Sequence, residues 1–447
     1  MANSPWTVRG YRHLFGAQVV GLAGNGLTTV ALGLLAYRLA GPDAAAVLGT
    51  ALAIKMIAYV TIAPVAGGYV DRFNRRRLLV VLDTVRAGTV AMLPFVDQVW
   101  QVYVLLALTQ SASAAFTPTF QATLPDLLPD EGQYTRALSY SQLASTLETL
   151  LSPVLAALLV TVVDFHWLFA CTSAAFVISG LLVVTSGIPD APTISRGGAV
   201  DRISAGLRIF AATPRLRGVL GLDVAVAGAG SIVMVNTVNL VQQDLGRTEA
   251  DVAWLLAANG AGVFLVAFAV PRLLDRYGDR TVMLVGAGVL AAASAGILAQ
   301  TVALSGDWRW PVLLILWALV GGGTGAVLTP VGNVLRRSSR PEDRPALFAA
   351  QFSLSHAAWL VAYPIAGWGA TIAGYGPTWA VLAALVLAGF ATAVHSWRRD
   401  DPDRLPHFHP TTDTPEPGHL VGATAVTGGY VHTHAFVIDR DHRRWPR

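Results

Sequence analysis

The chain contains the stretch Gly67-Gly68-Tyr69-Val70-Asp71-Arg72-Phe73-Asn74-Arg75-Arg76-Arg77 between two apolar runs. The stretch Asp275-Arg276-Tyr277-Gly278-Asp279-Arg280 follows about 204 residues later, and it also lies between two apolar runs. A single charged loop of this kind is common wherever long apolar segments are connected. Two copies half a chain apart indicate an internal duplication, so the chain is predicted to fold as two similar bundles.

The composition places most of the chain in a membrane. Hydrophobic residues make up 54% of the 447 residues and charged residues 13%, compared with roughly 25% charged residues in soluble domains. Runs of about 20 apolar residues, each enough to cross roughly 30 Å of hydrocarbon, lie near 14–37, 45–68, 79–97, 101–118, 137–163, 167–188, 218–242, 252–272, 282–304, 311–333, 346–372 and 378–396. They predict an all-α transmembrane fold of twelve helices.

The twelve runs divide the chain into four parts. Residues 1–188 and 218–397 are predicted to form two six-helix bundles, which are joined by a cytoplasmic linker at 189–217. Residues 398–447 are polar and form a tail outside the membrane. Each half begins and ends on the same side, so the halves form a parallel repeat about an axis along the membrane normal. Such a repeat predicts a binding site between the bundles, near the midplane.

Further matches support the duplication. Thr117-Pro118 ends the fourth run as Thr329-Pro330 ends the tenth, and Gln142 in the fifth run falls opposite Gln351 in the eleventh.

Basic residues predict the orientation. With the N-terminus inside, 26 of the 31 Lys and Arg residues fall on that side and three on the other, while Lys55 and Arg86 lie within helices. By the positive-inside rule both termini are predicted to be cytoplasmic, in a multi-pass protein of the cytoplasmic (inner or plasma) membrane. This asymmetry accounts for the net charge of +4, so no nucleic-acid partner is expected. The first apolar run is too long for a cleavable signal peptide.

The sequence indicates neither an enzyme nor a cofactor. A P-loop requires Gly-Lys followed by Ser or Thr, whereas Lys55, the only lysine, stands between Ile54 and Met56. The stretch Gly286-Ala287-Gly288 lies inside an apolar run and is explained by helix packing. The only cysteine, Cys171, permits no internal disulfide. A duplicated membrane bundle without an ATPase is typical of secondary transporters.

The stretch at 67–77 resembles the loop signature between the second and third helices of the major facilitator superfamily. Gly67 matches its close-packing glycine, Asp71 its acid, and Arg72, Arg75 and Arg76 its basic cluster. The resemblance implies a cytoplasmic gate. The carboxylate is offered to a helix N-terminus and the guanidinium groups to acids or helix C-termini, which latches the bundles in one of two states. The alternative is a loop that is basic only because it is cytoplasmic.

The second copy is expected to contribute Asp275, Arg276 and Arg280 to the same gate. It departs from the signature, because Pro271 stands where a glycine would fit. The arginine motif of the fourth helix, found in many of these exporters, is absent, since Ala107 occupies its place.

Charged residues within the apolar runs predict a central cavity. A charge at the bilayer centre costs about 2.5–3.5 kcal/mol on insertion scales, so Lys55 should face a partner or a wet cavity. Glu148 stands where drug exporters usually carry a glycine, and it lies with His356 at a similar depth on the fifth and eleventh helices. Together with Asp223 and Asn25 they are predicted to couple protons and bind substrate. A structural Lys55–Glu148 pair and a satisfied core histidine at 356 are the alternatives.

The tail carries six of the ten histidines, at 407, 409, 419, 432, 434 and 442. The segments 420–427 and 430–438 flank Gly428-Gly429, which predicts a β-hairpin. On a strand, His432 and His434 share a face and have a spacing that can bind Zn²⁺, Ni²⁺ or Co²⁺. The tail is similar to those of family members linked to nickel or cobalt resistance. A solvated tail with incidental histidines is the alternative.

Over residues 1–397 the chain resembles a twelve-helix exporter of the type that includes macrolide and siderophore exporters. The resemblance implies alternating access driven by the proton gradient. Protons, the lipid bilayer and a small organic or amphipathic substrate are the expected partners, and a divalent metal ion such as nickel or cobalt is the alternative substrate.

Overall fold

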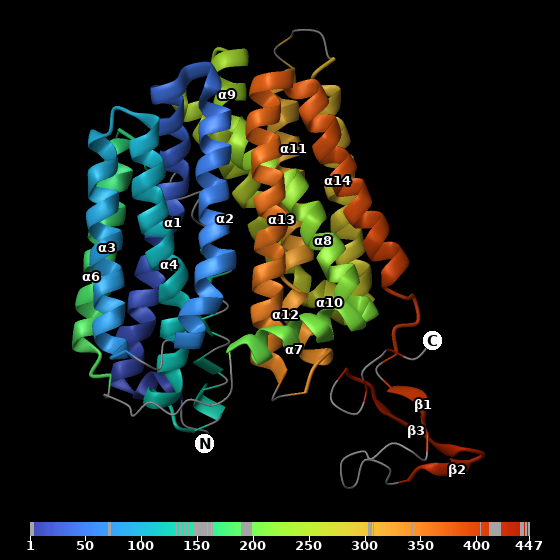
Figure 1. Cartoon of the computed structure of the whole chain (residues 1–447). Helices are drawn as coiled ribbons and strands as arrows, with labels where there is room; N and C mark the ends of the chain where they lie inside the picture. The colour runs from blue at the N-terminus through green and yellow to red at the C-terminus, as the bar shows by residue number, and fades with distance from the viewer. Residues whose placement is uncertain are drawn as a thin grey trace.

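The computed structural model describes residues 4–69, 73–130, 132–134, 136–137, 140–141, 144–145, 148, 159, 162, 164–188, 199–302, 306, 308–340, 343–402, 404–410, 422–438, 442 and 445. Figure 1 shows long helices that run side by side, with α1, α2, α3, α4 and α6 in one half and α8, α10, α11, α13 and α14 in the other. A small β-sheet lies beyond one end of the helices.

The helices of the first half follow the predicted runs. They are α1 (Arg9–Ala40), α2 (Ala44–Tyr69), α3 (Arg75–Met92), α4 (Val99–Leu127) and α6 (His166–Thr185), with short 3₁₀ turns at Pro5–Thr7, Gly41–Asp43 and Leu93–Phe95. Asn74 caps α3, because its side-chain oxygen accepts from the backbone N–H of Arg77 at 2.9 Å. Most of the predicted fifth run, 137–163, lies outside the described residues.

The helices of the second half are α8 (Pro214–Ser231), α9 (Thr237–Asn239), α10 (Glu249–Ala299), α11 (Arg309–Leu328), α12 (Val331–Arg337), α13 (Arg344–Ala373) and α14 (Tyr375–Ser396). Two π-helical segments, Ile232–Asn236 and Leu240–Asp244, flank α9. Gly278 divides α10 into two limbs with φ 74° and ψ 162°, a conformation that glycine adopts without a Cβ clash. The limbs match the predicted runs at 252–272 and 282–304.

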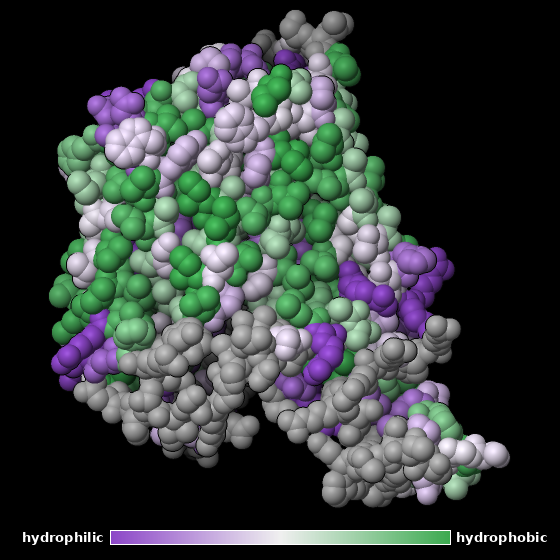
Figure 2. All heavy atoms as spheres, viewed as in Figure 1, coloured by the Kyte–Doolittle hydropathy of each residue, from purple (hydrophilic) through white to green (hydrophobic). Residues whose placement is uncertain are grey.

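The outer surface suits a membrane. Among the described residues, eight helical segments are long and apolar enough to cross one, and two of these, 9–66 and 249–299, each contain two such helices. Apolar side chains cover much of the middle of the face in Figure 2, with polar ones gathered toward the ends. Leu265, Phe268 and Ile372 are each more than two-thirds exposed, which only a lipid surrounding makes favourable.

Among the described residues, the two halves meet mainly through α2 and α13. Near the start of α2, a Cβ added to Gly49 would lie 2.9 Å from Cα of Gly367 on α13, so the two backbones touch. One residue further along each helix, the Trp368 indole donates to the Thr50 hydroxyl at 3.0 Å. Asn239 donates to the backbone oxygen of Gly41 at 3.2 Å. These contacts close the halves at the end away from the β-sheet (Figure 1).

The predicted linker contains a helix. α7 (Ala199–Ala212) runs across the end of the bundle that carries the tail and contacts both α13 and α2. A Cβ added to Gly206 would lie 2.2 Å from the backbone oxygen of Ala346, so α7 rests directly on the first turn of α13. The helical part of the predicted linker is therefore packed against both halves.

The tail forms a three-stranded antiparallel sheet in the order β1-β3-β2. Its strands are β1 (Arg404–Pro410), β2 (Thr424–Val426) and β3 (Gly429–Ala435). The hairpin predicted around Gly428-Gly429 is confirmed by the β2–β3 pairing, in which Val426 faces Gly429. Strand β1 was not predicted.

Candidate functional site

An aromatic and charged cluster lies where the halves meet. Lys55 and Tyr59 are one turn apart on α2, so they share a face of that helix. The Tyr59 ring stacks on the His356 ring of α13, with centroids 5.1 Å apart and planes 4° apart. His356 Nδ1 lies 2.6 Å from the backbone oxygen of Phe352, and because a carbonyl only accepts, Nδ1 carries the proton. In the neutral tautomer with this contact, the lone pair of the ring is on Nε2.

Glu148 joins this cluster. Its carboxylate interacts electrostatically with the Lys55 ammonium and with the Tyr59 hydroxyl, and Lys55 also interacts with His356. All four side chains are half-buried. The structure thus brings together three of the five residues predicted for the cavity and adds Tyr59.

The other two predicted cavity residues, Asp223 and Asn25, make other contacts. Asp223, on α8, is only 3% exposed, and its carboxylate accepts from the Gln351 amide of α13 at 2.8 Å. Both residues belong to the second half. Asn25 is half-buried on α1, where its backbone oxygen accepts from the Thr29 hydroxyl at 3.2 Å.

A buried ion pair in the first half extends the cluster. Arg86 pairs with Asp83 one turn earlier on α3, and both side chains are at most 3% exposed. The Ser179 hydroxyl donates to the second Asp83 oxygen at 2.8 Å. The Arg86 guanidinium lies between the rings of Phe116 and Phe176, 4.1 and 4.4 Å from their centroids, and it interacts electrostatically with Tyr59. Tyr59 therefore lies between two charged pairs.

The first gate loop is described in part. Gly67 lies in the last turn of α2, whereas Asp71 and Arg72 lie outside the described residues. Arg75 pairs with Asp126 and donates to the backbone oxygen of Ala122 at 2.7 Å, near the end of α4. Arg76 donates to the backbone oxygen of Val184, near the end of α6. Guanidinium groups at these carbonyls meet the negative ends of two helix dipoles, and both contacts lie within the first half.

The second gate loop makes an equivalent contact. Arg280 donates through Nε to the backbone oxygen of Trp397 at 2.9 Å, just beyond the end of α14. Arg76 therefore binds the end of the last helix of the first half, and Arg280 binds the end of the last helix of the second. Asp275 and Arg276 are exposed, and the Arg276 guanidinium lies 5.2 Å from the centroid of the Tyr277 ring.

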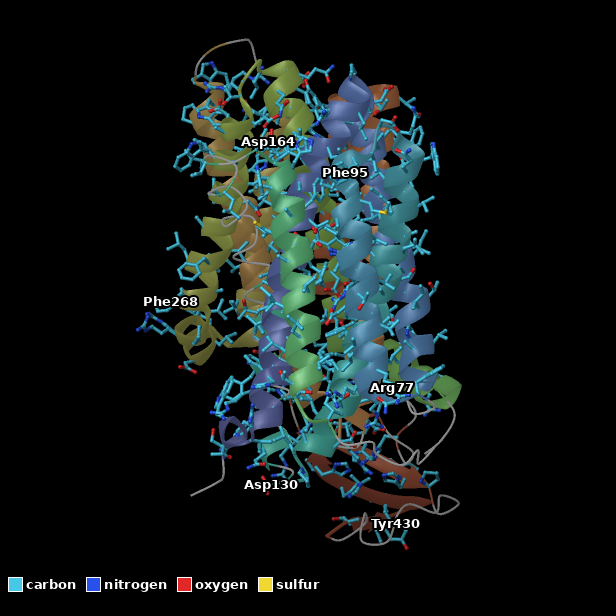
Figure 3. All side chains as sticks on the ribbon, turned by 90° about the vertical axis from the view of Figure 1, so that its left-hand side faces the viewer. Arg77, Phe95, Asp130, Asp164, Phe268 and Tyr430 are labelled. Atoms are coloured by element: carbon cyan, nitrogen blue, oxygen red, sulfur yellow. The ribbon has the colours of Figure 1, made fainter. Side chains whose placement is uncertain are left out.

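Labelled side chains of Figure 3 lie at both ends of the bundle. Figure 3 shows Arg77 and Asp130 at the end that carries the β-sheet, and Phe95 and Asp164 near the opposite end.

Four tail histidines converge. The β1–β3 register places His407 opposite His432, and His434 follows on the same face of β3. The ligand atoms of His407, His432, His434 and His442 all lie within 4.8 Å of one another. Burial, together with the neighbouring imidazoles, lowers the pKa of His407 to about 4. His419 lies outside the described residues.

Comparison with known proteins identifies the family of this chain. The model of the Major Facilitator Superfamily matches residues 14–238 and 219–426, which together cover most of the chain. The chain belongs to the major facilitator superfamily. It is therefore a multi-pass membrane transporter and not an enzyme, as the sequence predicted.

Relatives in this superfamily include efflux proteins. The chain is 25% identical to the multidrug efflux pump Tap of Mycolicibacterium fortuitum over 389 residues, which are 83% of this chain and 91% of that protein. It is 28% identical to macrolide efflux protein A of Streptococcus pyogenes over 189 residues, or 41% of this chain and 46% of that protein. It is 26% identical to the MFS-type transporter YfiS of Bacillus subtilis, over 59% of this chain and 64% of that one. The chain thus spans about half of the macrolide protein and less than two-thirds of YfiS.

Solved structures of two other transporters share the fold. An auto-inhibited peptide transporter of the POT family superposes with a TM-score of 0.67 at 13% identity, over 87% of this chain and 96% of that chain. The nucleoside transporter NupG superposes with a TM-score of 0.65 at 13% identity, over 87% and 99%.

Some residues of these sites were not predicted from the sequence to take part in them. The Asp83–Arg86 pair gave a readable signal, since two opposite charges one turn apart inside an apolar run need each other. Tyr59 gave none, because a lone tyrosine in an apolar helix is unremarkable. The histidines at 407 and 442 were counted with the tail, but only the sheet register shows that they meet His432.

Proposed function

We propose that this protein is a proton-coupled exporter of small organic or amphipathic compounds, with both termini in the cytoplasm. The observation that carries the proposal is the cluster of Lys55, Tyr59, Glu148 and His356 at the junction of α2 and α13. Titratable groups inside a membrane are costly, and they mark substrate or proton pathways in transporters. Here they occupy the surface along which two halves of a transporter move.

Glu148 is the proposed proton carrier. When Glu148 is ionised, its charge is balanced by Lys55, and when it is protonated, the cluster gains a net positive charge. Proton binding thus changes the electrostatic energy of the contact between the halves, which biases them toward one of two arrangements. The stack between Tyr59 and His356 forms only when α2 and α13 are close at this level.

The relatives favour export over uptake. Macrolide efflux protein A and the pump Tap are named for efflux of macrolides and of multiple drugs, and half-buried aromatic rings at the interface suit amphipathic compounds of this kind. The basic loops, the N-terminal start of α1 and the tail sheet lie at one end of the bundle (Figure 1), so by the positive-inside rule that end faces the cytoplasm.

The test is proton-driven transport in proteoliposomes. The substrate is first found by growing a deletion strain and a complemented strain on a panel of drugs and metals. Purified wild type, Glu148→Gln and Glu249→Gln are then compared under an imposed pH gradient. Glu249 is an exposed residue in the first turn of α10, so it controls for the chemistry of the substitution. We expect Glu148→Gln alone to lose pH-driven transport while it still binds substrate. Unchanged transport would leave only a structural role for Glu148.

Export of a divalent metal such as nickel or cobalt is the second candidate, and it is favoured by the four converging tail histidines. A metal exporter should lose metal tolerance when residues 404–447 are removed. A drug exporter should keep its drug tolerance after the same truncation, because the tail lies beyond the last membrane helix.

A further inference from the structure

We infer that His407, His432, His434 and His442 bind one divalent transition-metal ion of the zinc and cobalt class, at a site outside the transport pathway. The four residues come from two strands and the segment that follows them, beyond the last membrane helix α14. The site is independent of the export proposed above, because none of its residues lies between the two halves.

The spacing of the ligand atoms suits such an ion. Four nitrogens around a tetrahedral metal, at bonds of about 2.0–2.1 Å, lie roughly 3.3 Å from one another. The Nε2 atoms of His432 and His442 each lie 2.9 Å from Nε2 of His407, and all the ligand atoms lie within 4.8 Å of one another. These separations bracket the tetrahedral edge, so small side-chain rotations bring the set to metal-binding geometry.

The tautomer of His407 is set by its own strand. Its Nδ1 lies 3.1 Å from the backbone oxygen of Leu405, and since a carbonyl only accepts, Nδ1 carries the proton of the neutral ring. The Nε2 lone pair of His407 then points at His432 and His442. A backbone carbonyl that orients a histidine in this way is the usual outer-sphere support of a metal ligand.

The surroundings hold the cluster in place. His432 and His442 are buried, and the Phe436 ring packs against His407 and His442 with centroids 5.0 and 4.6 Å away. Trp445 packs on Phe436 at 5.1 Å and lies 5.3 Å from the Arg215 guanidinium at the start of α8. Phe436 and Trp445 therefore pack beside the ligand set and connect it to Arg215 at the start of α8.

Solvent reaches the ligands through a pocket of about 640 Å³, which is lined in part by His432, His434, Arg336, Arg340 and Arg404. The pocket provides an entry path, as a metal site requires. The arginines oppose a bare dication by charge repulsion, so we expect a dissociation constant of roughly 1 µM rather than the much tighter values of structural zinc sites.

The test titrates full-length protein, purified in detergent and stripped of metals with a chelator, with Co²⁺ and Zn²⁺. We expect one ion per chain, a visible absorption spectrum of four-coordinate Co²⁺, and displacement of Co²⁺ by Zn²⁺. His442→Ala and the milder His434→Gln should each weaken binding by at least about tenfold. His395→Ala, an exposed histidine of α14 outside the cluster, should bind as wild type does.

Two results would overturn the site: binding weaker than roughly 100 µM, or equal affinities of His442→Ala, His434→Gln and His395→Ala. Circular dichroism and thermal unfolding of each variant show whether the membrane helices are intact, and if His442→Ala fails to fold, His434→Gln alone decides. Metal binding without metal transport in proteoliposomes places the ion outside the pathway. Transport that needs the four histidines would overturn that part of the inference.

Discussion

The Tyr59 ring on α2 and the His356 ring on α13 stack across the two halves of the protein, with planes 4° apart. In the first half, Tyr59 interacts electrostatically with Glu148 and Arg86. In the second half, His356 is oriented by the backbone oxygen of Phe352. The ring stack therefore connects the charged groups around Tyr59 in the first half to an oriented imidazole in the second, alongside the electrostatic interaction of Lys55 with His356.

The first prediction measures this contact. Tyr59→Ala and His356→Ala are expected to have non-additive effects on the free energy of unfolding. The coupling should be about 0.5–1.5 kcal/mol, as aromatic pairs show in double-mutant cycles. Tyr59→Ala combined with Phe268→Ala is the control, because Phe268 is an exposed residue of α10. That pair should be additive. A Tyr59–His356 coupling no larger than that of the control pair would mean that the stack does not stabilise the contact between the halves.

The second prediction concerns closure at the end away from the tail. A Cβ at Gly49 would lie 2.9 Å from Cα of Gly367, so Gly49→Leu should push α2 and α13 apart there. Overpacking of this kind costs about 1–3 kcal/mol, which shifts the equilibrium between the closed and open arrangements by roughly 5–150-fold. Transport should fall because one of the two alternating states becomes rare.

Gly88→Leu is the matched control, because Gly88 is an exposed α3 residue whose added Cβ would have nothing within 4 Å. Transport rates of both variants, measured at equal protein density in proteoliposomes, check the prediction. Cross-linking of cysteines introduced at Thr50 and Trp368 should drop in Gly49→Leu and not in Gly88→Leu. Full cross-linking in Gly49→Leu would show that the helices still close.

The third prediction tests the gate loop through a residue that the structure describes. Asp126 pairs with Arg75, and the two side chains are 18% and 17% exposed. Asp126→Asn removes the Asp126 carboxylate from the Arg75 guanidinium at the end of α4, so we expect a loss of about 1–2 kcal/mol in the free energy of unfolding. Asp97→Asn, at an exposed position, should cost under about 0.5 kcal/mol. Equal melting temperatures of the two variants would contradict the prediction.

Most of the membrane fold was readable in the sequence, because long apolar runs have few alternatives to a helix in lipid. The helix α7 was missed, since its arginine-containing segment was taken as a linker and its packing on α13 depends on tertiary contacts. Strand β1 was missed because Pro406 and Pro410 interrupt the strand pattern. The sheet tolerates them since β1 pairs only with β3 and is an edge strand.

The candidate sites were predictable only where a residue was chemically out of place. Lys55 and Glu148 are charges inside apolar runs, and lipid alone demands a partner for them. Tyr59 and Phe352, whose ring centroids lie 5.6 Å apart, join them through the way α2 packs on α13. No sequence periodicity fixes that rotation. Likewise, His407 and His442 are 35 positions apart in the sequence. The β1–β3 register places His407 opposite His432, and the fold after β3 brings His442 to 2.9 Å from His407.

The last prediction separates the roles of two carboxylates, half-buried Glu148 and buried Asp223. Asp223 accepts from the Gln351 amide at 2.8 Å within the second half. Asp223→Asn retains an oxygen that accepts from the Gln351 amide, so we expect the protein to fold. Gln351→Ala leaves a buried acid without this donor and should cost about 1–3 kcal/mol. Thermal unfolding should therefore rank Gln351→Ala below Asp223→Asn.

Transport then assigns the roles. If Glu148 carries the proton, Asp223→Asn retains transport driven by a pH gradient, with a rate within about threefold of wild type, a change of less than 1 kcal/mol in the barrier. Glu148→Gln is the comparison, measured in the same proteoliposome preparation series. The opposite result, loss of pH-driven transport in Asp223→Asn and its retention in Glu148→Gln, would move the proton site to α8. The pair of Lys55 and Glu148 would then serve only to hold α2 against the fifth helix.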